Sequence, residues 1–140
     1  MTNDRKTISD CYIFLLSKAY QRGHQLVQRR LKPFGITNVQ YVVLEMLWNR
    51  EGVTAAELGA QLMIDKATLS GIVERMTDSG LLTKRQDQKD RRLIHLFPSD
   101  RVNEMKTQLI AERKSANEEL LTGFSLGERL ELKRMLVEML

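Results

Sequence analysis

The spacing of apolar residues divides the first third of the chain into two predicted helices. Between residues 7 and 31 the apolar positions recur three and four residues apart, which is typical of a long amphipathic helix. Pro33 and Gly35 then end this helix. Thr37 can cap a second helix, with Gln40 at the capping-box position three residues on. We expect the buried stripe of this second helix to consist of Val39, Val42, Val43, Met46 and Leu47.

A third, shorter helix is predicted to begin after Thr54. Glu57 stands three residues on, so this pair also has the pattern of a capping box. Leu58 and Leu62 lie on the expected inner face of the helix. Residues 63–64 are expected to make a tight turn into the next element.

The helix predicted over residues 65–79 has one apolar face and one face of mostly small side chains. Asp65 can cap it, and the apolar positions follow the i, i+3, i+4, i+7 pattern of a single buried face. These inward residues are Leu69, Ile72, Val73 and Met76. The opposite side holds Ala67, Gly71 and Glu74, flanked by Lys66, Thr68, Ser70 and Arg75.

The glycine on this outward face points to a close approach by another group. A glycine inside a helix costs about 1 kcal/mol relative to alanine, and a DNA groove that meets the backbone at Gly71 would explain it. An amphipathic surface helix would show a similar polar side, but the capped helix before it and the hairpin after it favour a groove-binding helix. The side chains suited to DNA contact are Thr68 and Ser70 for base edges or phosphates, Ala67 for a thymine methyl group, and Lys66 and Arg75 for phosphates.

A β-hairpin is predicted after this helix. Gly80 can end the helix in the left-handed conformation, and residues 81–85 and 93–97 have the composition of two strands. The connection between the strands is long and basic, because residues 84–92 hold five cations against two anions. Arginines of such a loop can enter a narrow minor groove, where the negative potential is concentrated.

Asp90 does not favour DNA by its own charge. We expect it to hold Arg92, two residues on, through a charge-assisted hydrogen bond. The net charge of +4 and the pI near 9.4 suit a polyanionic partner, although charge alone does not identify one. A second basic group in the first third of the chain is interpreted as a solvated helix face; it consists of Lys18, Arg22, Arg29, Arg30 and Lys32.

Length and composition predict one compact domain. The chain has 140 residues, of which 42% are hydrophobic and 29% charged. It has no apolar run of about 18 residues and no hydrophobic leader, so we expect a cytoplasmic protein without a membrane span. The single cysteine and the two distant histidines predict no disulfide, no metal site and no cofactor.

These segments resemble the MarR family of transcriptional regulators over nearly the whole chain. The matching segments are I-T-N-V-Q-Y-V-V-L-E-M-L at 36–47, T-A-A-E-L-G-A-Q-L at 54–62, D-K-A-T-L-S-G-I-V-E-R-M-T-D-S-G-L-L at 65–82 and D-Q-K-D-R-R-L-I-H-L at 87–96, with D-R-R at 90–92 as the family's signature. The resemblance implies a mainly α fold in a single domain over 1–140, with a winged helix-turn-helix lobe at 37–98, a two-stranded β wing, and N- and C-terminal dimerisation helices at 7–34 and 100–140.

The resemblance also implies a homodimer that binds a pseudo-palindromic operator in double-stranded DNA. In that arrangement the helix over 65–79 lies in the major groove and Arg92 lies in the minor groove. Gly71 departs from many family members, which have a larger polar residue there. The implied DNA-binding residues are Thr54, Lys66, Ala67, Thr68, Ser70, Gly71, Arg75, Lys89, Asp90, Arg91 and Arg92.

The two ends of the chain independently suggest dimerisation. Residues 101–122 predict a helix, and Ser125 with Glu128 forms a capping box before a strongly apolar chain end. Monomers rarely expose such surfaces, so we expect these helices and residues 7–31 to pack against a second copy; the alternative is that they cover only their own domain. The apolar stripe of the 101–122 helix is Val102, Met105, Leu109, Ala116 and Leu120.

The family resemblance further implies a small anionic aromatic effector that releases the DNA. Candidate liners are Tyr12, Arg22, His24, Tyr41 and Trp48, although each of them is more often a plain core or surface residue. Cys11 invites comparison with the family's peroxide sensors. Its spacing to Thr37 is two residues longer than theirs and the chain has no second cysteine, so a buried small hydrophobe is the favoured interpretation.

Three classes of function are compatible with these features. The leading hypothesis is a sequence-specific DNA-binding regulator, expected to be a repressor because repression is the family's usual mode. The alternatives are a redox-sensing regulator that acts through Cys11 and a winged-helix module that binds other proteins. An enzyme is disfavoured, because the sequence shows no nucleophile and base pair, no carboxylate dyad and no phosphate-binding glycine loop.

Overall fold

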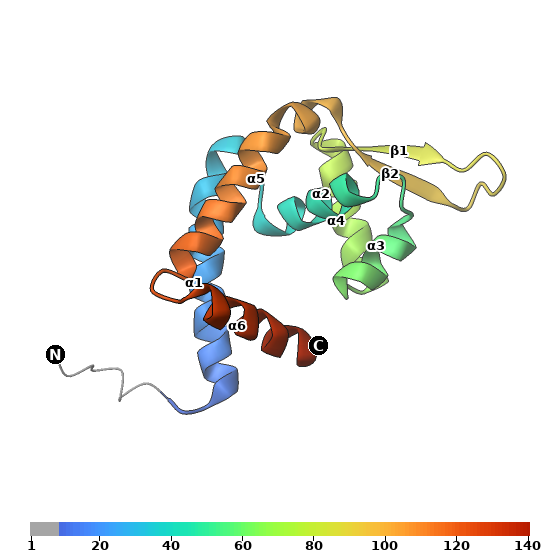
Figure 1. The fold of residues 1–140 in the computed structure, drawn as a ribbon. Coiled ribbons are helices and arrows are strands. Elements are labelled where there is room, and N and C mark those ends of the chain that lie inside the picture. Colours follow the sequence, from blue (N-terminus) through green and yellow to red (C-terminus); the bar gives the residue numbers. More distant parts are fainter. Residues whose placement is uncertain (1–8) are drawn as a thin grey trace. The chain divides into compact units, whose positions relative to one another are not determined.

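The computed structural model describes residues 9–140, which form two compact units. Unit 1 combines the N-terminal part of the chain up to Arg30 with Glu112–Leu140, and unit 2 is Leu31–Ala111. The elements, drawn in Figure 1, are α1 Tyr12–Leu31, the short 3₁₀ helix η2 Lys32–Phe34, α2 Asn38–Asn49, α3 Ala55–Leu62, α4 Lys66–Asp78, β1 Leu82–Gln86, β2 Ile94–Pro98, α5 Asp100–Leu120 and α6 Leu126–Glu138. This confirms the predicted mainly α fold with a two-stranded wing. Within residues 9–140, no helix is long and apolar enough to cross a membrane.

Helix α1 begins at Tyr12, five residues later than predicted. Of the expected first turn, residues 7 and 8 lie outside the described residues, and residues 9–11 are not helical. The backbone N–H of Cys11 donates to Ser9 Oγ (3.0 Å), a local turn that competes with helix formation. Cys11 is exposed, as are its neighbours from 9 to 20, so among the described residues the expectation of a buried thiol is wrong.

Within unit 1, the C-terminal half of α1 packs against the C-terminal half of α5. A β-carbon on Gly23 would lie 3.3 Å from Leu120 Cδ2, so the helices approach closely there. Arg30 bridges the pair by donating to Glu112 Oε2 (3.2 Å) and Glu119 Oε2 (3.3 Å). The buried side chains of this unit are Leu26, Val27 and Ala116. The predicted α5 stripe is confirmed, with Val102, Leu109 and Ala116 buried and Met105 and Leu120 half-buried.

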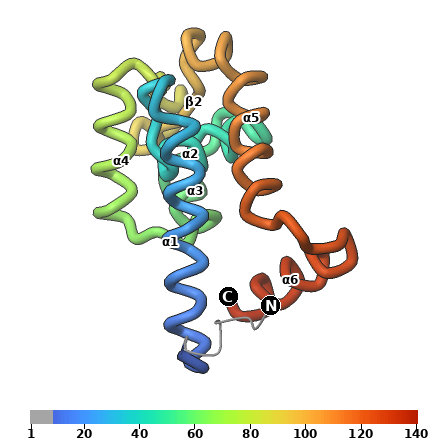
Figure 2. Tube along the Cα trace, turned by 90° about the vertical axis from the view of Figure 1, so that its left-hand side faces the viewer, coloured from blue at the N-terminus to red at the C-terminus, as the bar shows by residue number. Residues whose placement is uncertain are grey.

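Helix α6 follows α5 after a short connection at 121–125 (Figure 2). The predicted capping box is present: Glu128 N–H donates to Ser125 Oγ (3.2 Å), and Ser125 N–H donates to Glu128 Oε1 (2.9 Å). Arg129 ties the connection back to α5 through Glu118 Oε2 (2.7 Å). Among the described residues none of α6 is buried, and its apolar side chains are exposed except Leu132, which is half-buried.

In unit 2, helix α2 begins with the predicted capping box, in which Gln40 N–H donates to Thr37 Oγ1 (3.3 Å) and Thr37 N–H donates to Gln40 Oε1 (3.0 Å). The predicted buried stripe is partly wrong, because Val39 in the first turn is 39% exposed. Almost every residue from 41 to 48 is apolar, so periodicity alone does not choose a face there. The buried residues are Tyr41, Val43, Leu44 and Leu47, with Val42 and Met46 half-buried.

Helix α3 is capped by Thr54, whose Oγ1 accepts the N–H of Glu57 (3.2 Å). The expected reciprocal bond is absent, so the predicted capping box is only half formed. Glu57 Oε1 instead accepts the Thr54 hydroxyl (3.3 Å), and its Oε2 lies 3.3 Å from Arg50 Nη2. The predicted tight turn follows: Met63 adopts the left-handed conformation with φ 53°, and Ile64 N–H donates to the carbonyl at position 59 (3.0 Å).

Each strand of the hairpin begins and ends one residue later than predicted. Gly80 is in the left-handed conformation with φ 77°, as expected, and Leu81 N–H donates back to Met76 O (2.8 Å) to close the end of α4. Because that N–H belongs to the helix end, β1 starts at Leu82. The antiparallel register pairs Leu82 with Pro98, which has no N–H to give and stands at the end of the ladder.

The base of the hairpin is anchored in unit 2 and its loop projects away from the helices, as Figure 1 shows. Strand β1 contacts α4, and β2 contacts α2 and α3. Leu81, Leu82 and Leu96 are buried at this base. Burying a leucine side chain stabilises a fold by roughly 1.5–3 kcal/mol, so these residues fix the direction of the hairpin relative to α4.

Candidate nucleic-acid interface

Helix α4 presents an exposed polar face opposite its buried apolar face. Its inward residues Leu69, Ile72, Val73 and Met76 are buried, as predicted. Asp65 caps the helix by accepting the N–H of Thr68 (2.8 Å), and it also accepts the Thr68 hydroxyl (2.7 Å). These hydrogen bonds lower the pKa of Asp65. Because the Thr68 hydroxyl already donates its hydrogen to Asp65, its oxygen can only accept a further hydrogen bond. The exposed residues of α4 are Lys66, Ala67, Thr68, Ser70, Glu74, Arg75 and Asp78, with Gly71 and Thr77 half-buried.

The close approach expected at Gly71 is made by the chain's own Arg75. A β-carbon on Gly71 would lie 3.3 Å from Arg75 Nη1 and 3.9 Å from its Cζ. Helical side chains lean toward the N-terminus, so a residue four positions on reaches back over this site. The glycine thus lets the guanidinium lie on the middle of the outward face. The expectation was that a DNA groove explains Gly71; within the chain, the Arg75 side chain already makes the close approach.

The joint between α3 and α4 depends on a second glycine, which the sequence analysis missed. A β-carbon on Gly59 would come within 3.1 Å of Leu69 Cδ2 and 3.3 Å of the Ile64 carbonyl oxygen. Gly59 is buried, so the two helices meet at its backbone. A glycine in the middle of a short predicted helix was the available signal.

Thr54, expected among the DNA-binding residues, is buried, and its hydroxyl oxygen caps the start of α3. It supports the position of α3 and does not reach the surface. Lys89, Arg91 and Arg92 of the hairpin loop are exposed, as their assigned role requires.

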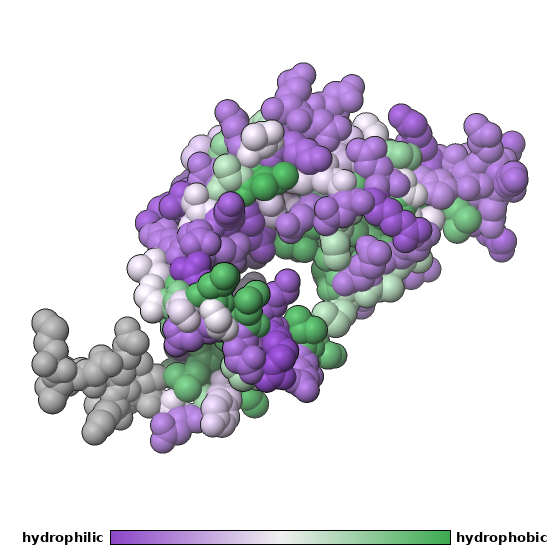
Figure 3. All heavy atoms as spheres, in the orientation of Figure 1, coloured by the Kyte–Doolittle hydropathy of each residue, from purple (hydrophilic) through white to green (hydrophobic). Residues whose placement is uncertain are grey.

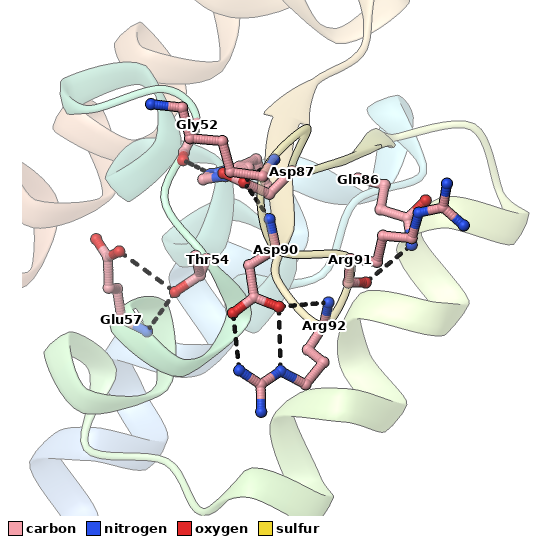
Figure 4. A network of polar contacts seen from close by, with 10 residues as sticks. Gly52, Thr54, Glu57, Gln86, Asp87, Asp90, Arg91 and Arg92 are labelled. Carbon is pink, nitrogen blue, oxygen red and sulfur yellow. Dashed lines mark hydrogen bonds and ion pairs between the residues drawn. The ribbon is translucent and has the colours of Figure 1, made fainter.

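Asp90 holds Arg92 as predicted (Figure 4). Arg92 Nε donates to Asp90 Oδ1 (3.1 Å), Nη2 donates to Oδ2 (3.1 Å), and the backbone N–H of Arg92 also donates to Oδ1 (3.0 Å). The arginine lowers the pKa of Asp90, and the carboxylate raises the pKa of Arg92. The Arg92 side chain is 89% exposed. Exposed ion pairs add little stability. The effect of this pair is therefore to fix the orientation of the Arg92 guanidinium.

The wing loop, residues 87–93, is organised around Asp87. Its Oδ1 accepts the N–H groups of Lys89 (2.8 Å) and Asp90 (2.9 Å), and its Oδ2 lies 2.8 Å from His95 Nε2. Gln86 Nε2 donates to the Arg91 carbonyl oxygen (2.8 Å). The hydrogen bond from His95, followed by the two backbone N–H groups, lowers the pKa of Asp87 to about 2. The loop is therefore closed around a carboxylate.

His95 was singled out in the sequence only as an unsuitable metal ligand, and the structure gives it a central place. Its Nδ1 lies 2.7 Å from the carbonyl oxygen of Gly52, between α2 and α3. A short β-bridge also pairs His95 with Thr54. The Asp87 carboxylate, and then the Gly52 carbonyl, raise the pKa of His95. Nothing local in the sequence joins residues 52, 87 and 95.

The structure does not bring the five candidate effector liners together within either unit. In unit 1, Tyr12 and Arg22 are exposed, and His24 is half-buried with an unpartnered Nδ1. Tyr12 and His24 stand twelve residues apart on α1, about 18 Å at 1.5 Å per residue. In unit 2, the buried Tyr41 ring meets the Trp48 ring edge to face, with centroids 6.1 Å apart.

The α3–turn–α4 segment followed by hairpin β1–β2 with its basic loop defines unit 2 as a winged helix-turn-helix. Residues 36–94 match the sequence profile of the MarR family. The chain belongs to the MarR family of transcriptional regulators.

Two curated relatives are bacterial transcriptional regulators. The HTH-type transcriptional regulator TtmR of Methylorubrum extorquens strain PA1 is 31% identical over 127 residues, which cover 91% of this chain and 63% of that protein. The organic hydroperoxide resistance transcriptional regulator of Bacillus subtilis strain 168 is 30% identical over 91 residues, 65% of this chain and 62% of that protein. The chain thus spans less than two thirds of the length of either relative.

Solved structures share the fold over almost the whole chain. A probable transcriptional regulator from Pseudomonas aeruginosa superposes with a TM-score of 0.85 at 27% identity, covering 94% of this chain and 98% of that one. A MarR mutant from E. coli complexed with operator DNA gives 0.83 at 21% identity, covering 90% and 91%. Bordetella bronchiseptica BpsR, whose DNA binding is regulated by 6-hydroxynicotinic acid, gives 0.86 at 24% identity, covering 94% of both chains.

Proposed function

We propose that this chain is a sequence-specific DNA-binding repressor that acts as a homodimer on a pseudo-palindromic operator. The observation that carries the proposal is the pairing of an exposed polar face on α4 with an arginine held outward by Asp90 in the same unit. A recognition helix and a wing of this kind contact adjacent grooves of one duplex. Such a regulator works where the chromosome is, which in a bacterium is the cytoplasm.

In this proposal α4 enters the major groove with its small outward face. Ser70 meets a base edge or a phosphate, the acceptor oxygen of Thr68 meets a hydrogen-bond donor on a base edge, and Ala67 meets a thymine methyl group. Lys66 contacts a phosphate beside the groove. Arg75, held over Gly71, contacts a base edge or a phosphate from the middle of the helix.

The wing loop supplies the second set of contacts. Arg92 enters the minor groove, since Asp90 presents its guanidinium away from the protein. Lys89 and Arg91 contact phosphates on either side. Thr54 contributes from inside by capping α3, on which α4 rests.

The homodimer is supported by the exposed apolar surface of unit 1. Figure 3 shows apolar residues among the polar ones on α1 and α6. An apolar surface of this extent on a small protein marks an association site. Two-fold symmetry then places two copies of α4 on successive turns of DNA, which requires a pseudo-palindromic operator. The exposed apolar residues are Tyr12, Ile13, Phe14, Leu15, Leu16 and Tyr20 on α1, and Leu126, Leu130, Met135, Leu136 and Val137 on α6.

We further propose that a small anionic aromatic compound releases the DNA. BpsR, a protein of the same fold, is regulated by such an acid. Trp48 is the candidate liner best suited to an aromatic anion. Its ring is half-buried and the ammonium of Lys106 lies 5.8 Å from its centre, so an aromatic face and a cation stand together.

A binding measurement tests the DNA proposal. We expect fluorescence anisotropy to give a dissociation constant for duplexes from the upstream region of the chain's own gene at least about a thousandfold below that for random duplexes. The affinity should fall steeply as salt rises, and sedimentation should give twice the mass of one chain. Equal affinity for random DNA would rule out sequence-specific regulation. An unchanged affinity in Arg92→Ala would favour a winged-helix module for protein partners instead.

A second candidate is a peroxide-responsive regulator, favoured by the exposure of Cys11. In that case the Cys11 thiolate takes an oxygen atom from an organic hydroperoxide, which leaves a sulfenate on the protein and an alcohol in solution. Hydroperoxide should then lower operator affinity in the native chain and leave Cys11→Ser unaffected. Equal sensitivity of both proteins would eliminate this candidate.

A further inference from the structure

His95 is bound through both nitrogens of its ring. Nδ1 lies 2.7 Å from the carbonyl oxygen of Gly52, and Nε2 lies 2.8 Å from Asp87 Oδ2. Both partners can only accept: one is a backbone carbonyl, the other a carboxylate with a lowered pKa. A neutral imidazole has one N–H and the imidazolium has two. Only the protonated ring therefore satisfies this site.

Loss of the proton would break one of these contacts. A deprotonated ring nitrogen would direct its lone pair at an oxygen lone pair less than 3 Å away. The ring or the loop would then have to move. Gly52 belongs to the connection between α2 and α3, whereas Asp87 belongs to the wing loop, most of whose residues are exposed. We expect the wing loop to move away from His95.

The contacts continue from His95 to Arg92 through Asp87 and Asp90; Figure 4 labels the last three of these residues. Asp87 holds the imidazole with one oxygen and the Asp90 N–H with the other (2.9 Å). Asp90 in turn holds the guanidinium of Arg92 through two hydrogen bonds. Each link joins the next one directly, so the position of Arg92 depends on the state of His95.

The charges around the ring favour its protonation. Asp87 in the loop and Glu57 on α3 are both anionic, and partial burial of the ring opposes them. Arg85 stands opposite His95 in the strand register, but its guanidinium lies over the Phe97 ring, 4.6 Å from the centre. The net result is a pKa of His95 above its ordinary value of 6.5.

We propose that the imidazolium of His95 positions the wing loop, and with it Arg92, for DNA binding, so that deprotonation weakens the binding. This inference rests on the proposed function, and it makes His95 a positioning residue that touches no base. Bound DNA adds negative potential and an ordered loop, both of which favour the imidazolium further. Affinity should fall as pH rises, by at most about tenfold for each unit by which DNA raises the pKa of His95.

The titration can be followed without DNA. The chain has two histidines, so two ring resonances appear in an NMR titration, and His24→Gln assigns them. We expect His95 to titrate above its ordinary 6.5 in the native chain and lower in Asp87→Asn. A His95 titration at or below 6.5 in the native chain would overturn the inference. This result does not depend on whether the protein binds an operator.

The effect on binding is tested with the same variants at about pH 6 and about pH 8 at constant salt. We expect the native chain and His24→Gln to lose affinity several-fold at the higher pH, and His95→Gln to be equally weak at both. Asp87→Asn should also be weak and insensitive to pH. If Asp87→Asn keeps the full pH dependence, the phosphates act on His95 directly and the positioning role is wrong.

A double-mutant cycle identifies the arginine as the group that is positioned. In an Arg92→Ala background, adding His95→Gln should cost no further affinity, because the group that His95 positions is gone. Additive losses would contradict the inference. Absence of specific binding by the native chain at either pH would refute the proposed function, and the NMR titration would still decide the state of His95.

Discussion

The guanidinium of Arg75 lies over Gly71, with Nη1 3.3 Å from the point where a β-carbon would stand. This contact joins two features of α4 that look unrelated in the sequence, a helix-weakening glycine and a long cation. Because Gly71 has no side chain, the Arg75 guanidinium can lie near the centre of the exposed face, where the major groove of bound DNA would meet it. Substitutions at position 71 therefore have opposite effects on stability and on DNA affinity.

Gly71→Ala should raise the free energy of unfolding by about 0.5–1 kcal/mol, because alanine is the better helix former and the flexible end of Arg75 can give way. Gly71→Leu should displace the guanidinium and weaken operator binding several-fold. Urea unfolding and anisotropy measure the two effects. In an Arg75→Ala background the affinity loss from Gly71→Leu should shrink; an undiminished loss would show that the leucine itself obstructs the groove.

Gly59→Ala should destabilise the protein by about 1 kcal/mol or more, since the added carbon meets Leu69 and a backbone oxygen at 3.1 and 3.3 Å. Gly127→Ala is the matched control, because its added carbon would meet only Ser125 Oγ, at 3.9 Å. The control should be neutral or slightly stabilised. Equal behaviour of the two variants in thermal unfolding would contradict close packing at the α3–α4 joint.

Met63→Gly should stabilise the turn between α3 and α4 by a few tenths to about 1 kcal/mol. Met63 is the single non-glycine residue of positive φ within residues 9–140, and its side chain is exposed, so glycine relieves strain with little loss of packing. Met63→Ala keeps the strain and should show no gain. A loss of stability in Met63→Gly on urea unfolding would refute this explanation.

The pair of Asp87 and His95 should make the stability of the fold fall both at low pH and at high pH. Asp87 has a folded pKa of about 2 against an ordinary 3.8, so its contribution is present above 3.8 and is lost as pH falls toward 2. His95 has a raised pKa, so its contribution is complete below 6.5 and is lost as pH rises through the folded value. The stability difference between the native chain and His95→Gln should therefore be largest between about pH 4 and 6.5.

Unfolding by urea at stepped pH measures that difference, with His24→Gln as the control for the other histidine. A difference that stays constant up to about pH 9 would show that His95 contributes by packing alone.

Arg92→Ala should weaken operator binding by about 1–3 kcal/mol, and Asp90→Asn by less, since the arginine remains but loses its bidentate partner. Arg91→Ala is the comparison. As a phosphate contact it should lower affinity uniformly and reduce the salt slope by about one. If Asp90→Asn bound as tightly as the native chain, the orientation of Arg92 by its carboxylate would have no role in binding.

Much of the architecture depends on contacts between residues close together in the chain, and these were predictable. The caps at Thr37, Asp65 and Ser125 involve partners three residues away. Asp90 and Arg92 are two residues apart, and their opposite charges in one loop already specify a bond. The contact of Arg75 with Gly71 also has helical i, i+4 spacing, so its signal was present, although it was interpreted as space for DNA.

The sequence by itself thus determined the order of elements, the two faces of α4 and the arginine pair of the wing, because each follows from local periodicity, caps or neighbouring charges. Only the tertiary structure decided that Tyr41 is buried while Val39 is exposed, that Gly59 is the contact point of two helices, and that His95 reaches Gly52. The last pair is 43 residues apart. Contacts of that kind form only after helices and hairpin have packed, and nothing in the spacing of residues along the chain specifies which side chains then meet.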